Sequence, residues 1–503
     1  MSEILAQLFQ GFTVALEPIN VFAVIIGGIM GVIVGGLPGL ESVAGVALLL
    51  PLTFKMNPTT AVIMLAGIYY GNMFGGSISA ILLNIPGDSP AVMTAVDGYQ
   101  FARQGKAGKA LYTAFFASFI GGMIGAVILT FLGPALAFVG LRFGPAEFTS
   151  LILFALMSVG WLLGENPAKG IIATGIGLLL STIGVDMIQG LPRFTFGMVN
   201  LTAGIPFIPT VIGIFGFAQV LKLLSAGYEI GQTTMVTARL SIRDSFLSIK
   251  EWAEVSFTIV RGSLIGFFVG LLPGSGATMA SFMAYIAEMR LNKHPERLGK
   301  GALAGVAAPE SANNAASMGA FAPLLSLGIP GSGTTAILLG GLMMWGLTPG
   351  PLLFKEAPEF VWGLMASMYV GDIAVLLLCV LLVPFLAYIP RVPKAILAPT
   401  TIALCILGSF SVNNSIFDIW FMVFMGVVGY FMDRLQFPTP PLVLALVLAP
   451  RLQTAFRQAL MISPNGSPMI FITKPISLAF LLAAVVMVTL PVLIKKRKDS
   501  PSA

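Results

Sequence analysis

Long uncharged apolar stretches recur along the whole chain and are separated by short polar connections. A helix that crosses a bilayer needs about 20 mostly apolar residues, and many of these stretches meet or approach that length. Several stretches, such as 56–87 and 311–354, are too long for one crossing and must contain a hairpin or a pair of helices. The pattern predicts an all-α polytopic membrane protein with about 12 transmembrane helices.

The polar connections predict how the chain is divided. The longest, 227–261, is expected to be an amphipathic linker between a first membrane half at 1–226 and a second at 262–494, and a basic cytoplasmic tail follows at 495–503. Lys and Arg gather in the connections and in this tail, as the positive-inside rule expects of cytoplasmic segments. The first twenty residues include Glu3 and Glu17 but no basic residue, so we do not expect a cleaved signal peptide.

Composition agrees with a lipid environment and excludes several other classes of protein. Hydrophobic residues make up 57% of the 503 residues and charged residues only 10%, against about 25% charged in a typical soluble domain. The net charge of +6 comes without a basic patch interleaved with aromatic residues, so we expect no nucleic-acid binding. Two cysteines and one histidine supply neither a disulfide framework nor a metal or triad site.

Two Pro-Gly breaks interrupt apolar sequence in each half, in the same order. The first half has GGLPG at 35–39 and NIPGDS at 84–89, and the second has GLLPG at 270–274 and GIPGSG at 328–333. The spacing between matching breaks is close to half the chain length. This internal similarity predicts two pseudo-symmetric repeats, which we expect to be inverted, with broken or re-entrant helices at the Pro-Gly tips. An inverted pair requires an odd number of crossings in each half, and the segment count leaves this parity open.

The breaks are where the sequence places a binding site. Pro and Gly end helices and free backbone groups, which in lipid must be satisfied by protein or by a water-filled cavity. Helix N-termini suit an anion, and freed carbonyls with hydroxyl and amide oxygens suit Na⁺. Taken singly, each small polar residue is equally consistent with helix packing. The candidate substrate-binding residues are Gly39, Ser42, Asn84, Gly87, Ser89, Ser275, Asn313, Asn314, Gly331, Ser332 and Thr334.

Acidic and polar residues near the breaks are candidates for coupling transport to a cation, because acids at membrane depth are functional hypotheses by default. The cation-coupling candidates are Asp88, Glu310, Ser311 and Asn72. The alternative for Asp88 and Glu41 is solvation at a cavity mouth. Pro309 places Glu310 near an expected helix start, where a carboxylate also acts as a cap. Na⁺ is the only metal considered, and no other cofactor is expected.

Three long runs carry a resemblance to a known family. The runs GGLPGLESVAGVALLLPLTF, YYGNMFGGSISAILLNIPGDSPAVMTAVDGY and PESANNAASMGAFAPLLSLGIPGSGTTAILLGG resemble the large membrane subunit of the tripartite tricarboxylate transporters, the TctA type. The resemblance extends over essentially the whole chain. Transferred to matching positions, it implies substrate and cation contacts at Gly39, Asn84, Gly87, Asp88, Ser311, Asn313, Asn314, Gly331 and Ser332.

The resemblance also implies a function and partners. It implies a secondary transporter of the bacterial inner membrane that imports a di- or tricarboxylate such as citrate by symport, driven by a Na⁺ or H⁺ gradient without ATP. A periplasmic solute-binding protein would deliver the substrate, and a small four-helix membrane subunit would complete the assembly. The alternative is a stand-alone carrier or channel for small organic anions. An intramembrane enzyme is not expected, because His294 lies in a polar loop and leaves only acid pairs for catalysis.

Overall fold

The computed structural model describes residues 2–162, 167–186, 189–225, 245–274, 276–386 and 388–498. The first helices are α1 (Ser2–Ala15), α2 (Pro18–Gly36), α3 (Ser42–Leu49), η1 (Leu50–Thr53), α4 (Pro58–Leu83), η2 (Ser89–Ala91), α5 (Val92–Phe101), η3 (Ala102–Lys106), α6 (Ala107–Gly140), α7 (Pro145–Leu162), α8 (Pro167–Leu180), η4 (Val199–Leu201), α9 (Phe207–Val211), η5 (Ile212–Phe217) and α10 (Ala218–Ser225). The later helices are α12 (Ile249–Gly270), α13 (Gly276–Leu291), η6 (Pro295–Arg297), α14 (Leu303–Leu327), α15 (Gly333–Met344), α16 (Leu353–Glu356), α17 (Pro358–Leu386), η7 (Ile389–Arg391), α18 (Lys394–Asn413), α19 (Ile416–Arg434), α20 (Pro440–Ile462), η8 (Pro464–Gly466), α21 (Ile470–Thr473) and α22 (Pro475–Lys498).

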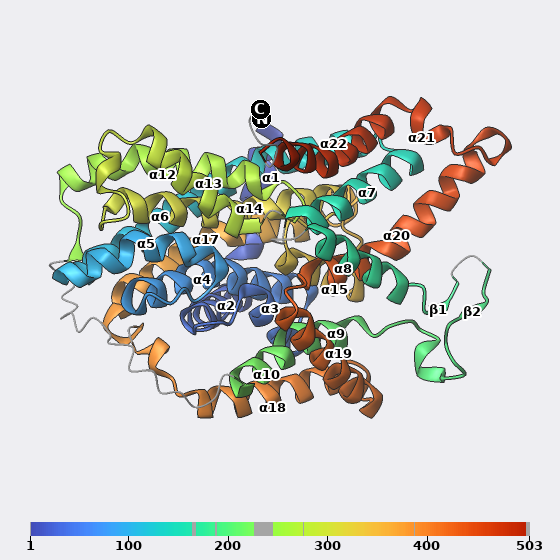
Figure 1. The fold of residues 1–503 in the computed structure, drawn as a ribbon, viewed down its shortest axis with the longest axis horizontal. Helices are drawn as coiled ribbons and strands as arrows, with labels where there is room; N and C mark the ends of the chain where they lie inside the picture. Colours follow the sequence, from blue (N-terminus) through green and yellow to red (C-terminus); the bar gives the residue numbers. More distant parts are fainter. Residues whose placement is uncertain are drawn as a thin grey trace.

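The described residues are helical apart from one short antiparallel pair, β1 (Gly184–Val185) with β2 (Pro192–Arg193), which lies at the edge of the molecule in Figure 1. Within the described ranges, eight helical segments are long and apolar enough to cross a membrane, and five shorter apolar helices accompany them. Large apolar side chains such as Phe257, Leu381 and Trp420 are exposed on outer faces, where lipid would cover them. The expected all-helical membrane fold is confirmed. About 12 crossings stay a prediction, because breaks divide apolar sequence into shorter helices.

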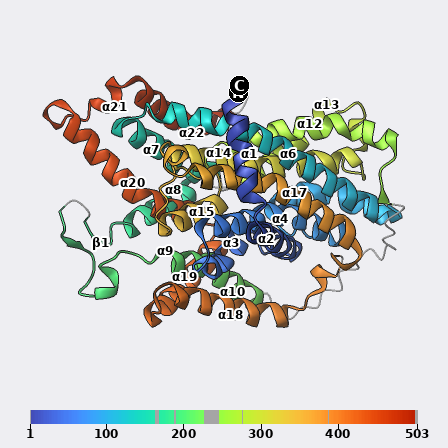
Figure 2. The same ribbon diagram turned by 180° about the vertical axis from the view of Figure 1, so that it is seen from behind.

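Helices α4 and α14 form the centre of the fold. Almost every residue of both is buried, including polar ones, and α14 packs against α4, α5, α6, α12 and α13. Two peripheral groups flank this centre in both Figure 1 and Figure 2: α7, α8, α20 and α22 on one side, and α9, α10, α18 and α19 on another. The polar residues of α4 and α14 therefore lie in the protein interior rather than against lipid.

Rows of glycine let α2 lie directly on α4. Gly27, Gly31 and Gly35 recur one turn apart, and a Cβ at Gly35 would overlap the Asn72 carbonyl oxygen of α4. Small residues with this spacing allow helix backbones to approach closely in a membrane, where packing replaces the hydrophobic effect. The contact fixes the end of α2 beside the middle of α4.

The same arrangement joins α12 to α14. Gly262, Gly266 and Gly270 recur one turn apart on α12, and a Cβ at Gly266 or Gly270 would overlap the carbonyl oxygen of Ala312 or Ala316. The capping box at the start of α12, formed by Ser248 and Glu251, begins this helix at Ile249. The helix therefore takes in the last residues of the expected linker 227–261, of which 227–244 lie outside the described residues.

Each Pro-Gly break separates two helices. The breaks lie between α2 and α3, between α4 and η2, between α12 and α13, and between α14 and α15. Asn84 and Gly328 end α4 and α14 in the left-handed conformation, with φ of 60° and 69°. Such a residue stops a helix and leaves the following Pro-Gly to redirect the chain.

Candidate functional site

The two breaks of each half contact one another. In the first half, a Cβ at Gly87 would overlap the Gly35 carbonyl oxygen, so only glycine fits at this position. In the second half, the Gly274 N–H donates to the Gly331 carbonyl oxygen at 3.0 Å. A Cβ at Gly331 would lie 2.7 Å from the Gly270 carbonyl oxygen. Both Pro-Gly tips thus have their backbone atoms packed against the other break of the same half.

Asp88 fastens the first-half tip to its neighbours. Its carboxylate accepts hydrogen bonds from the backbone N–H groups of Ser89 at 2.7 Å and Ser42 at 3.3 Å. In the orientation that satisfies both of its ends, the Asn72 amide donates to the same carboxylate and accepts from the Gly35 N–H at 3.0 Å. Asp88 therefore caps η2 and ties α3 and α4 to the break, which matches the structural role of a carboxylate at a helix start.

Ser332 caps the second-half tip. Its hydroxyl accepts from the Thr335 N–H at 3.2 Å, while the Thr335 hydroxyl accepts from the Ser332 N–H at 2.8 Å. The Tyr69 hydroxyl of α4 donates to the Ser332 hydroxyl oxygen at 3.1 Å. This reciprocal cap begins α15 and places its N-terminus next to the central helix α4.

The tips of the two halves meet at their helix N-termini. The hydroxyl oxygens of Ser42, the first residue of α3, and Thr334, in the first turn of α15, lie 3.0 Å apart. Ser89 donates a hydrogen bond to the carboxylate of Glu41, which is exposed. We call Ser42, Asp88, Ser89, Ser332 and Thr334 the tip cluster. It combines the positive ends of helix dipoles with hydroxyl and carboxylate oxygens.

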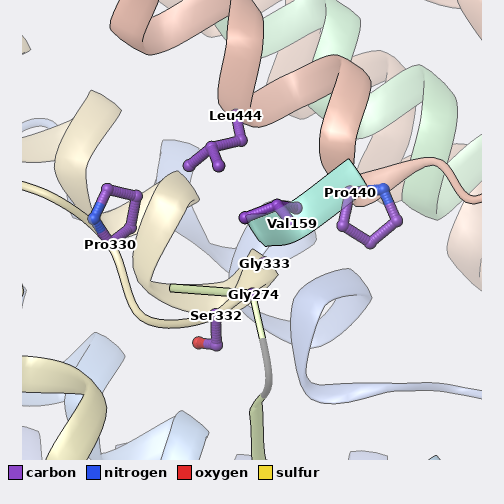
Figure 3. Close-up of a pocket in the computed structure, with 7 residues that line it drawn as sticks. All are labelled: Val159, Gly274, Pro330, Ser332, Gly333, Pro440 and Leu444. Carbon is purple, nitrogen blue, oxygen red and sulfur yellow. The ribbon is translucent and has the colours of Figure 1, made fainter. Parts of the chain in front are cut away.

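A narrow recess borders the tip cluster. Its lining residues are Val159, Gly274, Pro330, Ser332, Gly333, Pro440 and Leu444. Figure 3 shows the Ser332 hydroxyl on one side of this recess, with the apolar Val159 and Leu444 away from it. The recess is mostly apolar, and the Ser332 hydroxyl forms its polar side.

Glu310 lies in a second buried cluster. Its carboxylate accepts from the hydroxyls of Thr94 at 2.5 Å and Ser118 at 2.9 Å, and from the Asn313 amide at 3.4 Å. Asn314 donates to the Asn313 side-chain oxygen at 2.6 Å. We call Glu310, Asn313 and Asn314 the α14 cluster. All three side chains are fully buried, and the Asn314 side-chain oxygen has no hydrogen-bond partner within the described parts of the chain.

The expectation that Glu310 stands near a helix start is wrong. Helix α14 begins at Leu303, and Pro309 and Glu310 lie inside it. Membrane helices tolerate proline where neighbouring groups satisfy the freed backbone. Pro309 lacks the N–H that would bond the Gly305 carbonyl oxygen, and its own carbonyl oxygen accepts from the Ser281 hydroxyl of α13 at 3.3 Å. Glu310 is therefore held by side chains of α5 and α6 rather than by the end of its own helix.

The remaining candidates lie apart from these clusters. The Ser311 hydroxyl donates to the Ala308 carbonyl oxygen within α14, at 3.1 Å. Asn84 is exposed at the end of α4. Gly39 is also exposed, with φ of 87°, and a Cβ there would meet the Gln219 amide of α10. Ser275 lies outside the described residues.

Comparison with known proteins names the family. The sequence model described as the tripartite tricarboxylate transporter TctA family matches residues 21–444. This chain belongs to that family. It is therefore an inner-membrane component of a transporter and not an enzyme.

Two proteins of Agrobacterium vitis are similar to this TctA-family chain. One, described as an uncharacterized 52.8 kDa protein in the TAR-I ttuC' 3'region, is 39% identical over 502 residues, which cover 99% of this chain and 98% of the relative. The other, an uncharacterized protein in the TAR-II ttuC' 3'region, is 37% identical over 235 residues, which cover 46% of this chain and 97% of the relative. No solved structure matches this chain significantly.

Several residues near the candidate site of this TctA-family protein were not identified from its sequence. Tyr69, Thr94 and Ser118 hold the candidates in place, but single hydroxyls in apolar sequence give no signal. Arg451 of α20 brings a positive charge to the end of α14, where it donates to the Gly328 carbonyl oxygen at 3.3 Å and to the Pro349 carbonyl oxygen at 3.2 Å. A cation at a helix C-terminus is favourable.

Asp97 and Asp372 are among the buried acids that the sequence analysis did not single out. Asp97 accepts hydrogen bonds from the Tyr285 hydroxyl at 2.7 Å and from the backbone N–H groups of Gly299, Gly301 and Ala302 at 3.0, 2.9 and 2.8 Å, so it anchors the segment before α14. Asp372 is fully buried in α17. Its position directly before the uncharged stretch 373–390 could have identified Asp372 from the sequence, because acids at membrane depth are functional candidates. In the described ranges, no group of three or more His, Cys, Asp and Glu side chains could hold a metal ion.

Proposed function

We propose that this chain is the large membrane subunit of a binding-protein-dependent secondary transporter that imports a di- or tricarboxylate resembling citrate. Transport is by symport with Na⁺ or H⁺. A periplasmic solute-binding protein delivers the substrate, and a small four-helix membrane subunit completes the transporter. Membership of the tripartite family supports this assembly.

The observation that carries the proposal is the meeting of two helix N-termini across the two halves. The Ser42 and Thr334 hydroxyl oxygens, 3.0 Å apart, lie at the starts of α3 and α15. Positive dipole ends at such starts favour a carboxylate, and broken helices with this arrangement bind substrates in other secondary transporters. In this proposal, the tip cluster binds the substrate, with Gly87 and Gly331 allowing the close approach of the two tips.

The proposal includes two repeats, within 1–226 and 262–494, joined by 227–261 and followed by the tail 495–503. Matching contacts support it. Gly35 lies on Asn72 and Gly270 on Ala316, while Gly87 approaches Gly35 and Gly331 approaches Gly270. Helix caps correspond as well, because Asn84 and Gly328 end α4 and α14, and Asp88 and Ser332 cap the following helices. Movement of one set of helices against the other around the tips would give alternating access.

Coupling in this proposal uses Asp88, Asn72 and the α14 cluster. In this conformation the Asp88 carboxylate accepts hydrogen bonds from three donors, so a cation bound at the first tip would replace one of these donors. Glu310 and Ser311 lie on α14 against α6, where Ser118 and Gly121 contact them. A Na⁺ ion requires several oxygen ligands, and hydroxyls and amide oxygens of these residues are of that kind.

The test is uptake of labelled citrate by proteoliposomes that contain this chain and the small subunit. We expect uptake only with the binding protein present and a Na⁺ or H⁺ gradient imposed. Uptake that continues unchanged without either would contradict the proposal and favour a stand-alone carrier or channel. Liposomes with the small subunit alone serve as the blank.

A further inference from the structure

Asp372 is a fully buried acid that the proposed site leaves unused. It lies in the middle of α17, and neither of its carboxylate oxygens has a hydrogen-bond partner in the portion of the chain that the structure describes. An isolated ionised carboxylate in a low-dielectric interior costs many kcal/mol, so such a group holds a proton or a cation. The side chain is therefore poised to exchange one.

The immediate surroundings of Asp372 are tightly packed. On α6, a Cβ at Gly122 would overlap its carboxylate, so the backbone of α6 lies directly against the acid. On α4, the Tyr70 hydroxyl lies against Gly371, the residue before Asp372, and it is also fully buried and has no hydrogen-bond partner among the described residues. A hard cation needs several oxygen ligands, and none of the described hydrogen-bonding side chains reaches this carboxylate. This geometry fits a proton better than Na⁺.

Helix α4 connects Asp372 to the tip cluster. The Tyr70 hydroxyl lies against Gly371, next to the acid in the chain, while the adjacent Tyr69 donates to the Ser332 hydroxyl at 3.1 Å. Helix α6 makes a second connection, because Gly122 faces Asp372 and Ser118, one turn earlier, donates to Glu310 at 2.9 Å. A change in charge at Asp372 therefore acts on residues in direct contact with both candidate clusters.

We propose that Asp372 carries the coupling proton of this transporter, with the Tyr70 hydroxyl as its hydrogen-bond partner during proton exchange. The inference rests on the proposed cation-coupled function, assigns its ion as H⁺ and places the proton at Asp372 instead of at Asp88 or the α14 cluster. The proton binds to the Asp372 carboxylate from the periplasmic side and leaves to water on the cytoplasmic side. The neutral acid is compatible with the tightly packed state of α4, α6 and α17. The ionised acid requires water or another partner, which favours a rearranged state.

Several other titratable groups on α17 and the helices packed against it are bonded elsewhere or lie near helix ends. Helix α2 has no titratable residue. Glu3 of α1 and the adjacent Lys355 and Glu356 of α16 lie near the ends of these helices, which pack against α17. On α6, Lys109 pairs with Glu251 and the Tyr112 hydroxyl donates to the Val380 carbonyl oxygen. On α4, the Tyr69 hydroxyl donates to Ser332. On α17 itself, the Tyr369 hydroxyl is hydrogen-bonded to Thr130, and the remaining titratable groups are Glu359 and Cys379. Of the titratable groups on these helices, Tyr70 is the one whose hydroxyl lies against the residue next to Asp372.

Infrared spectroscopy of the assembled complex in lipid bilayers tests the assignment without transport. We expect a carbonyl band of a protonated carboxylic acid near neutral pH, and Asp372→Asn should remove one component of it. An unchanged band in Asp372→Asn would overturn the proposal. Loss of the band on adding Na⁺ at constant pH would also overturn it in favour of a sodium site. Glu310→Gln and Asp88→Asn show whether another buried acid supplies the band.

Transport supplies the second arm. A pH gradient of one unit drives about tenfold accumulation per coupled proton. Asp372→Asn should lose this accumulation of labelled citrate but keep citrate exchange across the membrane, which needs no net proton movement. Full gradient-driven accumulation in the variant would refute the inference. Absence of citrate uptake in the unmodified complex would instead contradict the proposed function, and the infrared result would still decide the role of Asp372.

Two further variants keep the test decisive. If Asp372→Asn does not assemble, Tyr70→Phe removes only the neighbouring hydroxyl and should shift the carboxylic acid band; an unshifted band would count against the proposal. Asp433→Asn is the matched control, because Asp433 is 53% exposed and pairs with Lys222 at the periphery. This control should keep both the band and the accumulation.

Discussion

The Ser42 and Thr334 hydroxyl oxygens lie 3.0 Å apart although 292 residues separate them in the chain. This contact joins the first residue of α3 to the first turn of α15, so it reports directly on whether the two tips stay together. Alternating access about the tips requires the helices that carry them to move relative to one another. The contact is therefore a natural place to block that movement.

A disulfide at this contact should stop transport reversibly. The variant Ser42→Cys with Thr334→Cys places two sulfur atoms within bonding range, since the two hydroxyls already touch. We expect oxidation to abolish citrate uptake and reduction to restore it, measured in the same proteoliposomes. Each single cysteine variant is the control, because the native Cys379 and Cys405 are buried. Full uptake by the cross-linked protein would show that the tips need not separate.

Side chains at the two tip glycines should abolish transport without preventing insertion. In Gly87→Val the new side chain would overlap the Gly35 carbonyl oxygen, and in Gly331→Val the Cβ would lie 2.7 Å from the Gly270 carbonyl oxygen. We expect normal amounts of both variants in the membrane but no citrate uptake. Gly175→Val is the matched control, because a Cβ at Gly175 meets nothing within 4 Å. Normal uptake by both tip variants would refute the site assignment.

Loss of the Asp97 carboxylate should destabilise the whole fold. Asp97→Ala leaves the Tyr285 hydroxyl and three backbone N–H groups without their acceptor. Unsatisfied buried donors cost about 1–3 kcal/mol each, so the free energy of unfolding should fall by roughly 3 kcal/mol or more. Thermal unfolding of the purified protein measures the change. Asp433→Ala, at an exposed ion pair, should change it by less than about 1 kcal/mol, and equal losses would exclude a special anchoring role for Asp97.

The Tyr69 hydroxyl should affect substrate affinity more than stability. Tyr69→Phe removes its hydrogen bond to Ser332, which is worth about 1 kcal/mol, or roughly a fivefold rise in KM for citrate uptake. The comparison variant is Tyr112→Phe, which removes a hydroxyl bonded to the Val380 carbonyl oxygen on another face. We expect Tyr112→Phe to leave KM unchanged. A similar KM in both variants would place Tyr69 outside the substrate site.

Much of the fold followed from local sequence. Uncharged apolar stretches identify membrane helices because lipid leaves no other way to satisfy the backbone, and the described residues contain eight helices suited to cross a membrane besides shorter apolar ones. Proline and glycine end helices through their own backbone geometry, so the four breaks were found at their positions in the chain. Family membership followed from the same long runs around these breaks. The repeats, the division of the chain and the site assignment stay predictions.

The sequence by itself determined that this protein is a helical membrane transporter component with four interrupted helices, because hydropathy and helix-breaking are properties of neighbouring residues. Only the tertiary structure decided which breaks touch, since the approach of Ser42 to Thr334 depends on packing between distant helices. It also moved Glu310 from a supposed helix start to the interior of α14, where Thr94 and Ser118 hold it. The unpaired environment of Asp372 likewise arises from α4 and α6 lying against α17.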